Sequence, residues 1–393
     1  MPGQFRHLAP ALARQPGNTV VFLTRRRDAD LPGVRRVSYS PTRCAGAETH
    51  HYVRFFENAV LHGQQALREC LLLAQDGFRP DLVIAHPGWG EALFIKDIFP
   101  RAVLVNYCEF YYRGTGADVG FDPSVPAGTD EVCRARARNA HLLLSLESCD
   151  HGISPTHWQR DSHPSIFRDK ISVVFDGIDT GTVRPAPDAS FALPDGTVLT
   201  ARDTVVTYAA RNLEPYRGFP SFMRAVPLIL KSCPEARIVI VGGDGISYGT
   251  AAPDGKTWRQ AMSCEVGWLD PARVHFLGRL PYSSYLSLLQ VSTVHAYLTV
   301  PFVLSWSCLE AMAAGCVVVG SRTPPVEEVI TAGHNGFLAG FLDPSAIAGQ
   351  VAEAVARRAS LGGMREQARR TVLDRYALDK CLPAQIRLLN SFL

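Results

Sequence analysis

Short apolar runs alternate with longer amphipathic stretches along the whole chain. Runs of three or four apolar residues fill most of Thr19–Leu23, Leu82–Ala85 and Val103–Asn106, and such runs are typical of strands covered on both faces. Between the first two, residues 48–75 carry apolar side chains at the three- and four-residue spacing of a helix. A further short strand is expected over 171–175.

A second alternating set begins after residue 203. Strands are expected at 204–209, 237–241, 274–277, 294–298 and 316–320, and helices at about 220–232, 282–290, before Gly315 and near the carboxy terminus. Strands that alternate with helices predict parallel sheets with helices on both faces. The expected fold class is therefore α/β, with two doubly wound, Rossmann-like domains.

A proline-rich stretch separates the two sets. Pro185, Pro187, Pro194 and Gly196 lie in a polar, irregular segment that is typical of a linker. The expected division is an amino-terminal domain over 1–182, a linker over 183–200, a carboxy-terminal domain over 201–375, and a helix over 376–393 that could pack back on the first domain. Ligands would bind at the carboxyl ends of the strands, in a cleft that both domains face.

The amino terminus departs from this pattern. A doubly wound domain normally opens with a strand, yet residues 2–4 are typical of a turn and Phe5–Ala13 of a helix. Either the first strand is missing or the domain manages without it. A missing central strand would leave its neighbours unpaired.

Composition and charge narrow the function classes. A chain of 393 residues with 47% apolar and 20% charged residues is typical of a globular protein of two or three domains. Its net charge of +3 is too small to favour a nucleic acid partner. An early basic cluster leaves two hypotheses open, peripheral contact with an anionic membrane surface or a solvated turn; it comprises Arg25, Arg26, Arg27, Arg35 and Arg36.

The cysteine pattern and the absence of long apolar runs bear on location. Ten cysteines without a CxxC pair or regular spacing favour reduced thiols in the cytoplasm, where the protein could lie at the inner membrane surface. We expect neither a membrane span nor a secretory signal. The neighbouring His50 and His51 lack the companions of a metal site, so no metal is expected.

Two arginines follow the strand expected at 204–209. Arg211 and Arg217 stand on either side of Glu214, and Gly218 opens the next turn. Two guanidiniums at a strand's carboxyl end suit a diphosphate, because arginine offers paired donors to phosphate oxygens. Glu214 could hold one of them in place. A surface loop with an ordinary ion pair fits the same spacing.

A second candidate is the turn and helix that begin near Pro301. The first amides of a helix are a ready anion site. Glu310 could complete a capping box with Ser307, which spacing alone favours, or accept both hydroxyls of a ribose. The glycine-rich turn at 242–245 is a weak dinucleotide fingerprint, because Tyr248 stands where a third glycine belongs.

The amino half offers a candidate sugar site after two of its strands. His86, Trp89 and Glu91 follow the strand at 82–85, whereas Glu109 and Tyr111 follow the strand at 103–106. Aromatic rings and carboxylates suit stacking on a sugar and binding its hydroxyls. A helix start with a packed Trp89 is an equally good interpretation.

Taken together, these segments resemble retaining glycosyltransferases of the GT-B fold, family 4. The resemblance is carried by ARNLEPYRGF, VHFLGRLPY, LEAMAAGCVVVG and HNGFL, and in the amino half by PGQFRHLAPALA, GISPTHWQ and FDGIDT. It implies transfer of a hexose from a nucleoside-diphosphate sugar with retained configuration, without metal or cofactor. The implied acceptor is a glycan, a lipid-linked molecule or a small molecule, in bacterial glycan biosynthesis.

The resemblance also assigns roles to residues. Arg211 and Arg217 would stabilise the leaving diphosphate, and Glu310, which matches the second carboxylate of the family's paired-glutamate motif, would bind the ribose. Further donor contacts would come from Gly3, Gly243, Gly278, Arg279, Phe302, Val303, Leu304 and Ser305. The acceptor would lie near His86, Trp89, Glu91, Glu109 and Tyr111.

Two substitutions depart from the family pattern. Phe302 stands in place of the first glutamate of the pair, which leaves the transferred sugar open, and the backbone of 302–305 could hold the donor instead. Arg217 replaces a lysine, with one extra residue in the spacing. The missing first strand is a third departure. Phe302 leaves open a GT-B epimerase or phosphorylase, and the missing strand together with the lost glutamate leaves open a non-catalytic nucleotide-sugar or glycan-binding protein.

Overall fold

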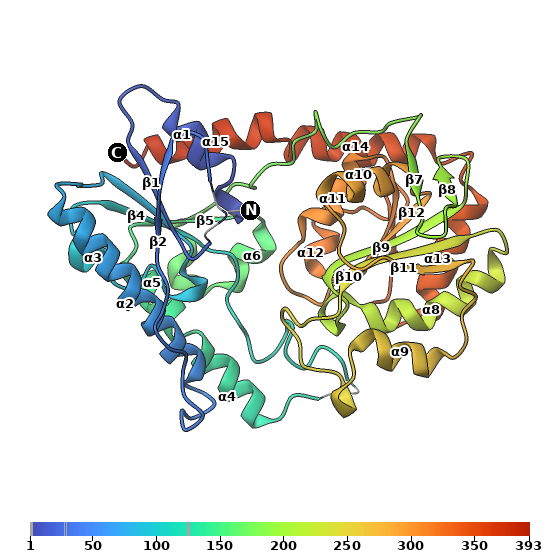
Figure 1. Cartoon of the computed structure of the whole chain (residues 1–393), viewed down its shortest axis with the longest axis horizontal. Coiled ribbons are helices and arrows are strands. Elements are labelled where there is room, and N and C mark those ends of the chain that lie inside the picture. Colours follow the sequence, from blue (N-terminus) through green and yellow to red (C-terminus); the bar gives the residue numbers. More distant parts are fainter. Residues whose placement is uncertain (1–2, 27, 29, 124–125) are drawn as a thin grey trace. The chain divides into compact units, whose positions relative to one another are not determined.

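The computed structural model describes residues 3–26, 28, 30–123 and 126–393. They form two compact units (Figure 1). Unit 1 comprises the chain up to Gly177 together with Leu378–Leu393, and unit 2 comprises Ile178–Ala377. Within the described residues, every helix is too short or too polar to span a bilayer.

Unit 2 is built on a six-stranded parallel sheet in the order β11-β10-β9-β12-β13-β14. Its strands are β9 (Val205–Asn212), β10 (Arg237–Gly243), β11 (Val274–Phe276), β12 (Val294–Tyr297), β13 (Val317–Ser321) and β14 (Phe337–Ala339). The chain adds β10 and β11 on one side of β9 and the remaining strands on the other. The order therefore reverses between β9 and β12, which is where doubly wound sheets bind ligands.

Helices cover both faces of this sheet (Figure 1). One face carries α8 (Phe219–Ser232) and α13 (Pro344–Ala356), and the other carries α10 (Tyr282–Val291), α11 (Trp306–Ala313) and α14 (Gly362–Arg375). The shorter elements are η3 (Pro215–Arg217), η4 (Pro253–Gly255), α9 (Trp258–Val266) and α12 (Pro324–Glu327). Because both faces are covered, the central strands are buried along nearly their whole length.

The segment expected to be an irregular linker contains a hairpin. Strands β7 (Ser190–Ala192) and β8 (Val198–Thr200) pair antiparallel. Phe191 and Leu199 pack into a core with Val205 of β9. These strands are not apparent from the sequence, because three residues are too few to show an alternation of apolar and polar positions within a polar segment.

Unit 1 contains two parallel sheets instead of one. Strands β3 (Leu82–Ala85), β4 (Val103–Tyr107), β5 (His151–Ser154) and β6 (Ile171–Val173) form the larger sheet, and β1 (Val20–Thr24) pairs only with β2 (Val34–Ser38). Before β1 the described chain forms η1 (Gly3–Phe5) and α1 (Leu8–Ala13), with no strand ahead of them; Pro2 lies outside the described residues. The ring of Phe5 lies 6.4 Å from Phe22 and 6.1 Å from Tyr107, so side-chain packing links the two sheets.

Helices also cover unit 1 on both sides (Figure 1). On one side α1 packs against α15 (Leu378–Asn390), and on the other lie α2 (Arg54–Gln75), α3 (Ile95–Ile98) and α5 (Ala140–Ser148). The remaining elements are η2 (Pro87–Trp89), α4 (Thr129–Arg138), α6 (His157–Ser162) and α7 (Ser165–Arg168). The strands expected at 19–23, 82–85 and 103–106 are thus all present, each within one residue of its predicted bounds.

Strand β2 is an element that the sequence analysis missed. Its arginines, Arg35 and Arg36, alternate poorly with the valines around them, and both are paired with acids: Arg36 lies 2.6 Å from Asp30 and Arg35 lies 3.7 Å from Asp76. The solvated turn expected here is therefore wrong. Arg27 of the same basic cluster lies outside the described residues.

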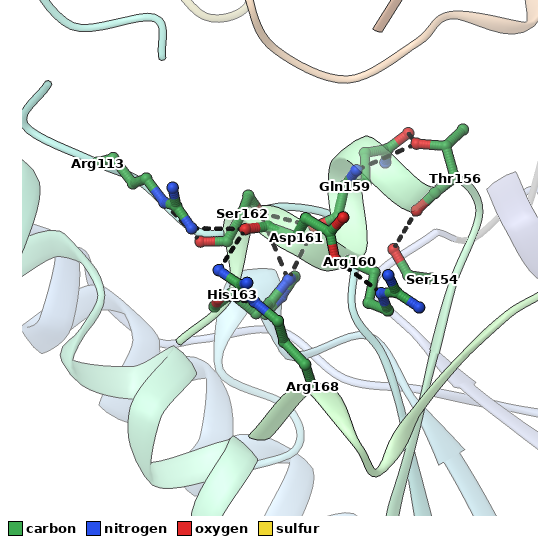
Figure 2. A network of polar contacts seen from close by, with 9 residues as sticks. All are labelled: Arg113, Ser154, Thr156, Gln159, Arg160, Asp161, Ser162, His163 and Arg168. Atoms are coloured by element: carbon green, nitrogen blue, oxygen red, sulfur yellow. Dashed lines mark hydrogen bonds and ion pairs between the residues drawn. The ribbon is translucent and has the colours of Figure 1, made fainter. Parts of the chain in front are cut away.

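Two arginines fasten the short helix α6 within unit 1 (Figure 2). Arg113 Nε donates to the carbonyl of Ser162 at 2.9 Å, and Arg168 donates to the carbonyls of His163 and Asp161 at 2.9 and 2.8 Å. These carbonyls lie at the carboxyl end of α6, where the helix leaves them unsatisfied. The amino end is capped by Thr156, whose hydroxyl accepts the amide of Gln159.

Candidate active site

The carboxyl ends of β9 and β12 bring a fixed arginine to the point where the strand order of unit 2 reverses. Arg217 Nη1 donates to Thr299 Oγ1 at 2.9 Å, to the carbonyl of Val303 at 3.0 Å and to Tyr297 Oη at 3.3 Å. All three acceptors are neutral, and Arg217 makes no ion pair within the described residues. Its positive charge is therefore positioned without being cancelled.

The turn that carries Arg217 depends on a glycine. Gly218 has φ +69°, and a Cβ there would lie 2.5 Å from Cβ of Leu298, just beyond β12. A larger residue would push η3 away from the end of β12. Gly218 thus allows the close approach that lets Arg217 reach Thr299.

Arg211 is placed at the same strand end but is not held. It belongs to β9, its side chain is exposed, and among the described residues it has neither a hydrogen bond nor an ion pair. The structure therefore fixes one of the two predicted cations and leaves the other free to move.

Glu214 does not hold either arginine, which corrects one of the expectations from its spacing. Its side chain is 1% exposed, and Oε2 accepts the amides of Ser247, Tyr248 and Gly249, each at 3.1 Å. The carboxylate stabilises the loop after β10. The ion-pair interpretation fails because Glu214 points into the unit and the amides of that loop surround it.

Three residues that are predicted to bind the nucleotide-sugar donor lie together beside β10, namely Gly243, Gly278 and Arg279. Arg279 Nη2 donates to Asn212 Oδ1 at 2.7 Å. A Cβ on Gly243 would lie 2.6 Å from Arg279 Nε, so the missing side chain leaves a path for the arginine. Gly278, with φ +63°, accepts the amide of Gly242 at 2.8 Å.

Glu310 lies on α11 and is 5% exposed. Tyr282 donates its hydroxyl to Glu310 Oε1 at 2.8 Å, and the carboxylate adds to burial in raising the pKa of Tyr285. The capping-box interpretation is wrong, because the cap is Ser305, whose hydroxyl accepts the amide of Ser307. Ser307 already lies inside the helix.

The backbone of 302–305 is partly occupied by the protein's own groups. The carbonyl of Val303 accepts a hydrogen bond from the Arg217 guanidinium, and the amide of Ser305 donates one to Tyr297 Oη at 2.8 Å. Leu304 is buried, and Phe302 is buried in a ring cluster with Tyr216 and Tyr248 at 5.5 and 5.0 Å. The Ser305 amide is therefore not open to a ligand as the structure stands.

In unit 1, the loop after β3 and the start of the chain converge on Glu109. His86 Nε2 lies 3.4 Å from Glu109 Oε2, and Gln4, next to Gly3 in η1, donates to Oε1 at 2.9 Å. Burial opposes a charged His86, but the hydrogen bond and charge of Glu109 outweigh it and raise the pKa of His86. Its Nδ1 accepts the amide of Gly88, so the neutral ring carries its proton on Nε2.

The other predicted acceptor-side residues differ in their surroundings. Trp89 is 62% exposed, which excludes the packed interpretation. Glu91 is largely buried: Oε1 accepts the hydroxyl of Tyr39, Oε2 has no hydrogen-bond partner among the described residues, and burial raises the pKa of Glu91. Tyr111 instead contacts α6, through Ser162 Oγ at 3.1 Å and the His163 ring.

Sequence reasoning missed the partners of these residues. Tyr39 lies just after β2, and Thr299 and Tyr297 lie at the end of β12. None belongs to a local motif, so only the packing of distant segments reveals them. Among the described residues, no group of three or more histidine, cysteine or acidic side chains is arranged to hold a metal ion.

Family models match both parts of the chain. Residues 16–183 match the glycosyl transferase family 4 group, and residues 203–357 match glycosyl transferases group 1. The chain belongs to the group 1, family 4-like glycosyltransferases. The matches span most of both units, including the fixed arginine, Glu310 and the His86–Glu91 loop.

Several solved structures share the fold of this glycosyltransferase. Sucrose-phosphate synthase from Thermosynechococcus elongatus has a TM-score of 0.69 at 17% identity and covers 98% of this chain and 92% of its own. HepE from Anabaena, in complex with UDP-glucose, has a TM-score of 0.62 at 15% identity, with 92% and 87% covered. A glycosyltransferase from Rickettsia africae has a TM-score of 0.66 at 12% identity, with 99% and 94% covered.

These likenesses identify the fold as GT-B, with two Rossmann-like domains. No curated protein sequence matches the glycosyltransferase. The architecture thus establishes the fold, and the family matches establish that the chain is a glycosyltransferase.

Proposed function

We propose that this glycosyltransferase moves a hexose from a nucleoside-diphosphate sugar with retention of configuration and without a metal ion. The observation that carries the proposal is Arg217, held by three neutral acceptors where the strand order of unit 2 reverses. Negative charge grows on the diphosphate as it leaves, and a positioned cation stabilises that charge. The complex of HepE with UDP-glucose supports this class of donor.

The other residues of unit 2 complete the donor site in this proposal. Arg211 supplies the second cation and moves onto the diphosphate when the donor binds. Glu310, whose Oε1 already accepts the hydroxyl of Tyr282, accepts the ribose hydroxyls. Arg279, with Gly243 and Gly278 beside it, borders the base.

Unit 1 binds the acceptor in this proposal, at the carboxyl ends of β3 and β4. His86 and Glu109 form a hydrogen-bonded pair there, and Trp89 offers an exposed ring on which a sugar can stack. Tyr111 flanks the site from its position against α6. The acceptor is a glycan, a lipid-linked molecule or a small molecule.

We place the enzyme in the cytoplasm, because all ten cysteines are free thiols and reduced thiols persist in that compartment. Membrane attachment through Arg35 and Arg36 is not part of the proposal, since both arginines are paired with acids of the chain.

Nucleotide release from a panel of nucleotide hexoses, with and without mixed glycan and sugar acceptors, tests the donor site. Replacing Arg217 with alanine should lower turnover by roughly 10²–10³-fold, the typical cost of removing one positioned donor. Arg357→Ala is the matched control, because Arg357 is an exposed arginine at the end of α13 that pairs with Glu353. Full turnover in Arg217→Ala would refute the assignment.

The stereochemistry and the metal requirement are measured on the same reaction. Proton NMR of the product should show the anomeric configuration of the donor, and turnover should persist in excess EDTA. Inversion, or loss of activity that added Mg²⁺ or Mn²⁺ restores, would contradict the proposal. A changed sugar released without any acceptor would instead indicate an epimerase.

A further inference from the structure

Unit 1 contains a cavity of about 290 Å³ that the proposed donor chemistry does not use. It lies where three parallel strands end: Arg25 follows β1, Arg43 follows β2, and Trp89 follows β3. The first turns of α2 form its wall, through Phe55, Asn58, Ala59 and His62. Cavities that hold small molecules begin at roughly 300 Å³, so this one suits a ligand the size of a monosaccharide.

Two glycines hold the loop that carries Trp89 against α2. Gly90 has φ +103°, and a Cβ there would lie 2.1 Å from the carbonyl oxygen of Ala59. A Cβ on Gly63 would lie 2.7 Å from the carbonyl oxygen of Gly90. The cavity wall is therefore built by backbone packing.

The lip of the cavity is aromatic. Trp89 is 62% exposed and Phe55 is 44% exposed, although both are large apolar side chains. Exposed aromatic rings beside a cavity are typical of sites where the apolar face of a sugar stacks. The guanidinium of Arg138 lies 4.1 Å from the Phe55 ring and 3.8 Å from the Tyr112 ring, which holds Phe55 in place.

Arg25 differs from the neighbouring arginines because it has no acidic partner. Arg26, Arg36 and Arg43 each form an ion pair at 2.6 Å, whereas Arg25 forms none among the described residues. Among the described residues its side chain forms a hydrogen bond with His62, whose Nε2 lies 3.5 Å from Arg25 Nη1. Most N–H donors of this guanidinium are therefore left for a ligand.

A chain of hydrogen bonds fixes the direction of that guanidinium. Arg25 donates to His62 Nε2, so the proton of the neutral imidazole lies on Nδ1, which faces Tyr39 Oη at 3.4 Å. The Tyr39 hydroxyl in turn donates to Glu91. Burial and the charge of Arg25 both lower the pKa of His62, in agreement with a neutral ring. The Arg25 guanidinium is thus held in the cavity lining by His62, which Tyr39 contacts in turn.

The charges around the cavity favour an anion. Its lining includes Arg25 and Arg43 but no carboxylate, and Arg138 stands behind Phe55 without an ion pair in the described chain. The nearby acids lie outside the lining: Glu57 neutralises Arg43, and burial raises the pKa of Glu91, which weakens its negative charge. A positive field remains at Arg25.

We propose that this cavity binds a phosphorylated acceptor, with the phosphate on Arg25 and the sugar ring stacked on Trp89. Arginine offers paired donors that match phosphate oxygens, and the exposed indole supplies the apolar surface that a sugar ring needs. The inference rests on the proposed function, because it names the acceptor class of that reaction. Both a soluble sugar phosphate and a phosphate-linked lipid sugar carry this chemistry.

Direct binding tests the site without requiring turnover. Calorimetry on the full chain would compare glucose 6-phosphate, fructose 6-phosphate and a polyprenyl-phosphate-linked sugar in detergent with glucose, glucuronate and inorganic phosphate. At least one phosphorylated ligand should bind, and at least tenfold more tightly than glucose. Arg25→Gln should weaken that binding by about 10–100-fold, as expected for loss of a charge-assisted hydrogen bond. Trp89→Leu should weaken it about fivefold to tenfold.

Arg101→Gln is the matched control. Arg101 is exposed in the same unit but precedes β4, so it lies at the amino end of that strand, whereas the cavity lies at the carboxyl ends of strands. It should bind like the unmodified protein. The soluble and lipid ligands identify the source of the phosphate, and binding of either one supports the proposal. It is overturned if no phosphorylated ligand binds, if glucose or glucuronate binds as tightly, or if Arg25→Gln changes nothing.

Binding and transfer fail in different ways. Sugar transfer to a neutral acceptor by a protein that binds none of the phosphorylated ligands would overturn the phosphate site and leave the transferase function intact. Phosphate-dependent binding that requires Arg25, without nucleotide release from any donor, would support the site and refute the proposed donor chemistry.

Discussion

Each carboxylate near the strand ends has a task set by its neighbours. Glu214 accepts three amides, Glu310 accepts a tyrosine hydroxyl, and Glu109 accepts Gln4 and faces His86. In the sequence all of them are acids that follow apolar runs. Which of them remains available to a ligand depends on how many of its lone pairs the fold already uses.

Glu214 is therefore expected to act on stability. Glu214→Gln replaces a charged acceptor of three amides with a neutral one, so the free energy of unfolding should fall by about 1–3 kcal/mol. Hydrogen exchange should speed up at Ser247, Tyr248 and Gly249. Glu265→Gln is the control, because Glu265 forms an exposed pair with Arg224 and such pairs contribute little. Unchanged protection of the loop would contradict this role.

At the scale of elements, glycines decide how closely turns approach their neighbours. Gly218 lets η3 approach β12, and Gly90 lets η2 approach α2. Apolar periodicity predicted most strands because burial on both faces selects long apolar runs. It missed β2 because two exposed arginines interrupt the pattern, and it placed the start of α2 six residues too early because residues 48–53 form turns.

Alanine substitutions at two glycines distinguish backbone strain in the folded state from conformational entropy of the unfolded chain, through their opposite effects on the free energy of unfolding. Gly218→Ala should lower the free energy of unfolding by about 1–3 kcal/mol, because φ +69° and the contact with Leu298 both oppose a Cβ. It should also slow nucleotide release, since η3 carries Arg217. Gly349→Ala, in α13 with nothing within 4 Å of the added Cβ, should instead stabilise by about 0.5–1 kcal/mol. Equal effects in denaturant titrations would exclude this account.

At the scale of the whole molecule, both units bury histidines that stay neutral. Burial lowers the pKa of His141 and His163 in unit 1, and of His295 in unit 2, to about 4. His295 contacts Thr207 at 2.9 Å through Nδ1, and its Nε2 has no hydrogen-bond partner among the described residues. Unlike His86, these three imidazoles have no carboxylate beside them among the described residues to stabilise a charged ring.

These histidines predict acid sensitivity. The unfolded chain takes up their protons near pH 6.5 and the folded chain only near pH 4, so stability is full above pH 6.5 and falls as the pH drops through that window. Each of these histidines should lower the free energy of unfolding by about 2–3 kcal/mol when the pH falls to 4. His295→Gln should flatten the loss measured by urea unfolding between pH 7 and 4. An unchanged slope in His295→Gln would reject the assignment.

The sequence by itself determined the α/β class, most of the strands and the membership of a glycosyltransferase family, because burial on both faces of a sheet leaves a local, periodic record along the chain. It also marked Arg217 and Glu310 as candidates. Only the tertiary structure decided that Glu214 holds a loop and that Arg25, His62, Tyr39 and Glu91 form one chain of hydrogen bonds. Those partners lie tens of residues apart, and no local pattern records which distant segments the closure of a fold will place in contact.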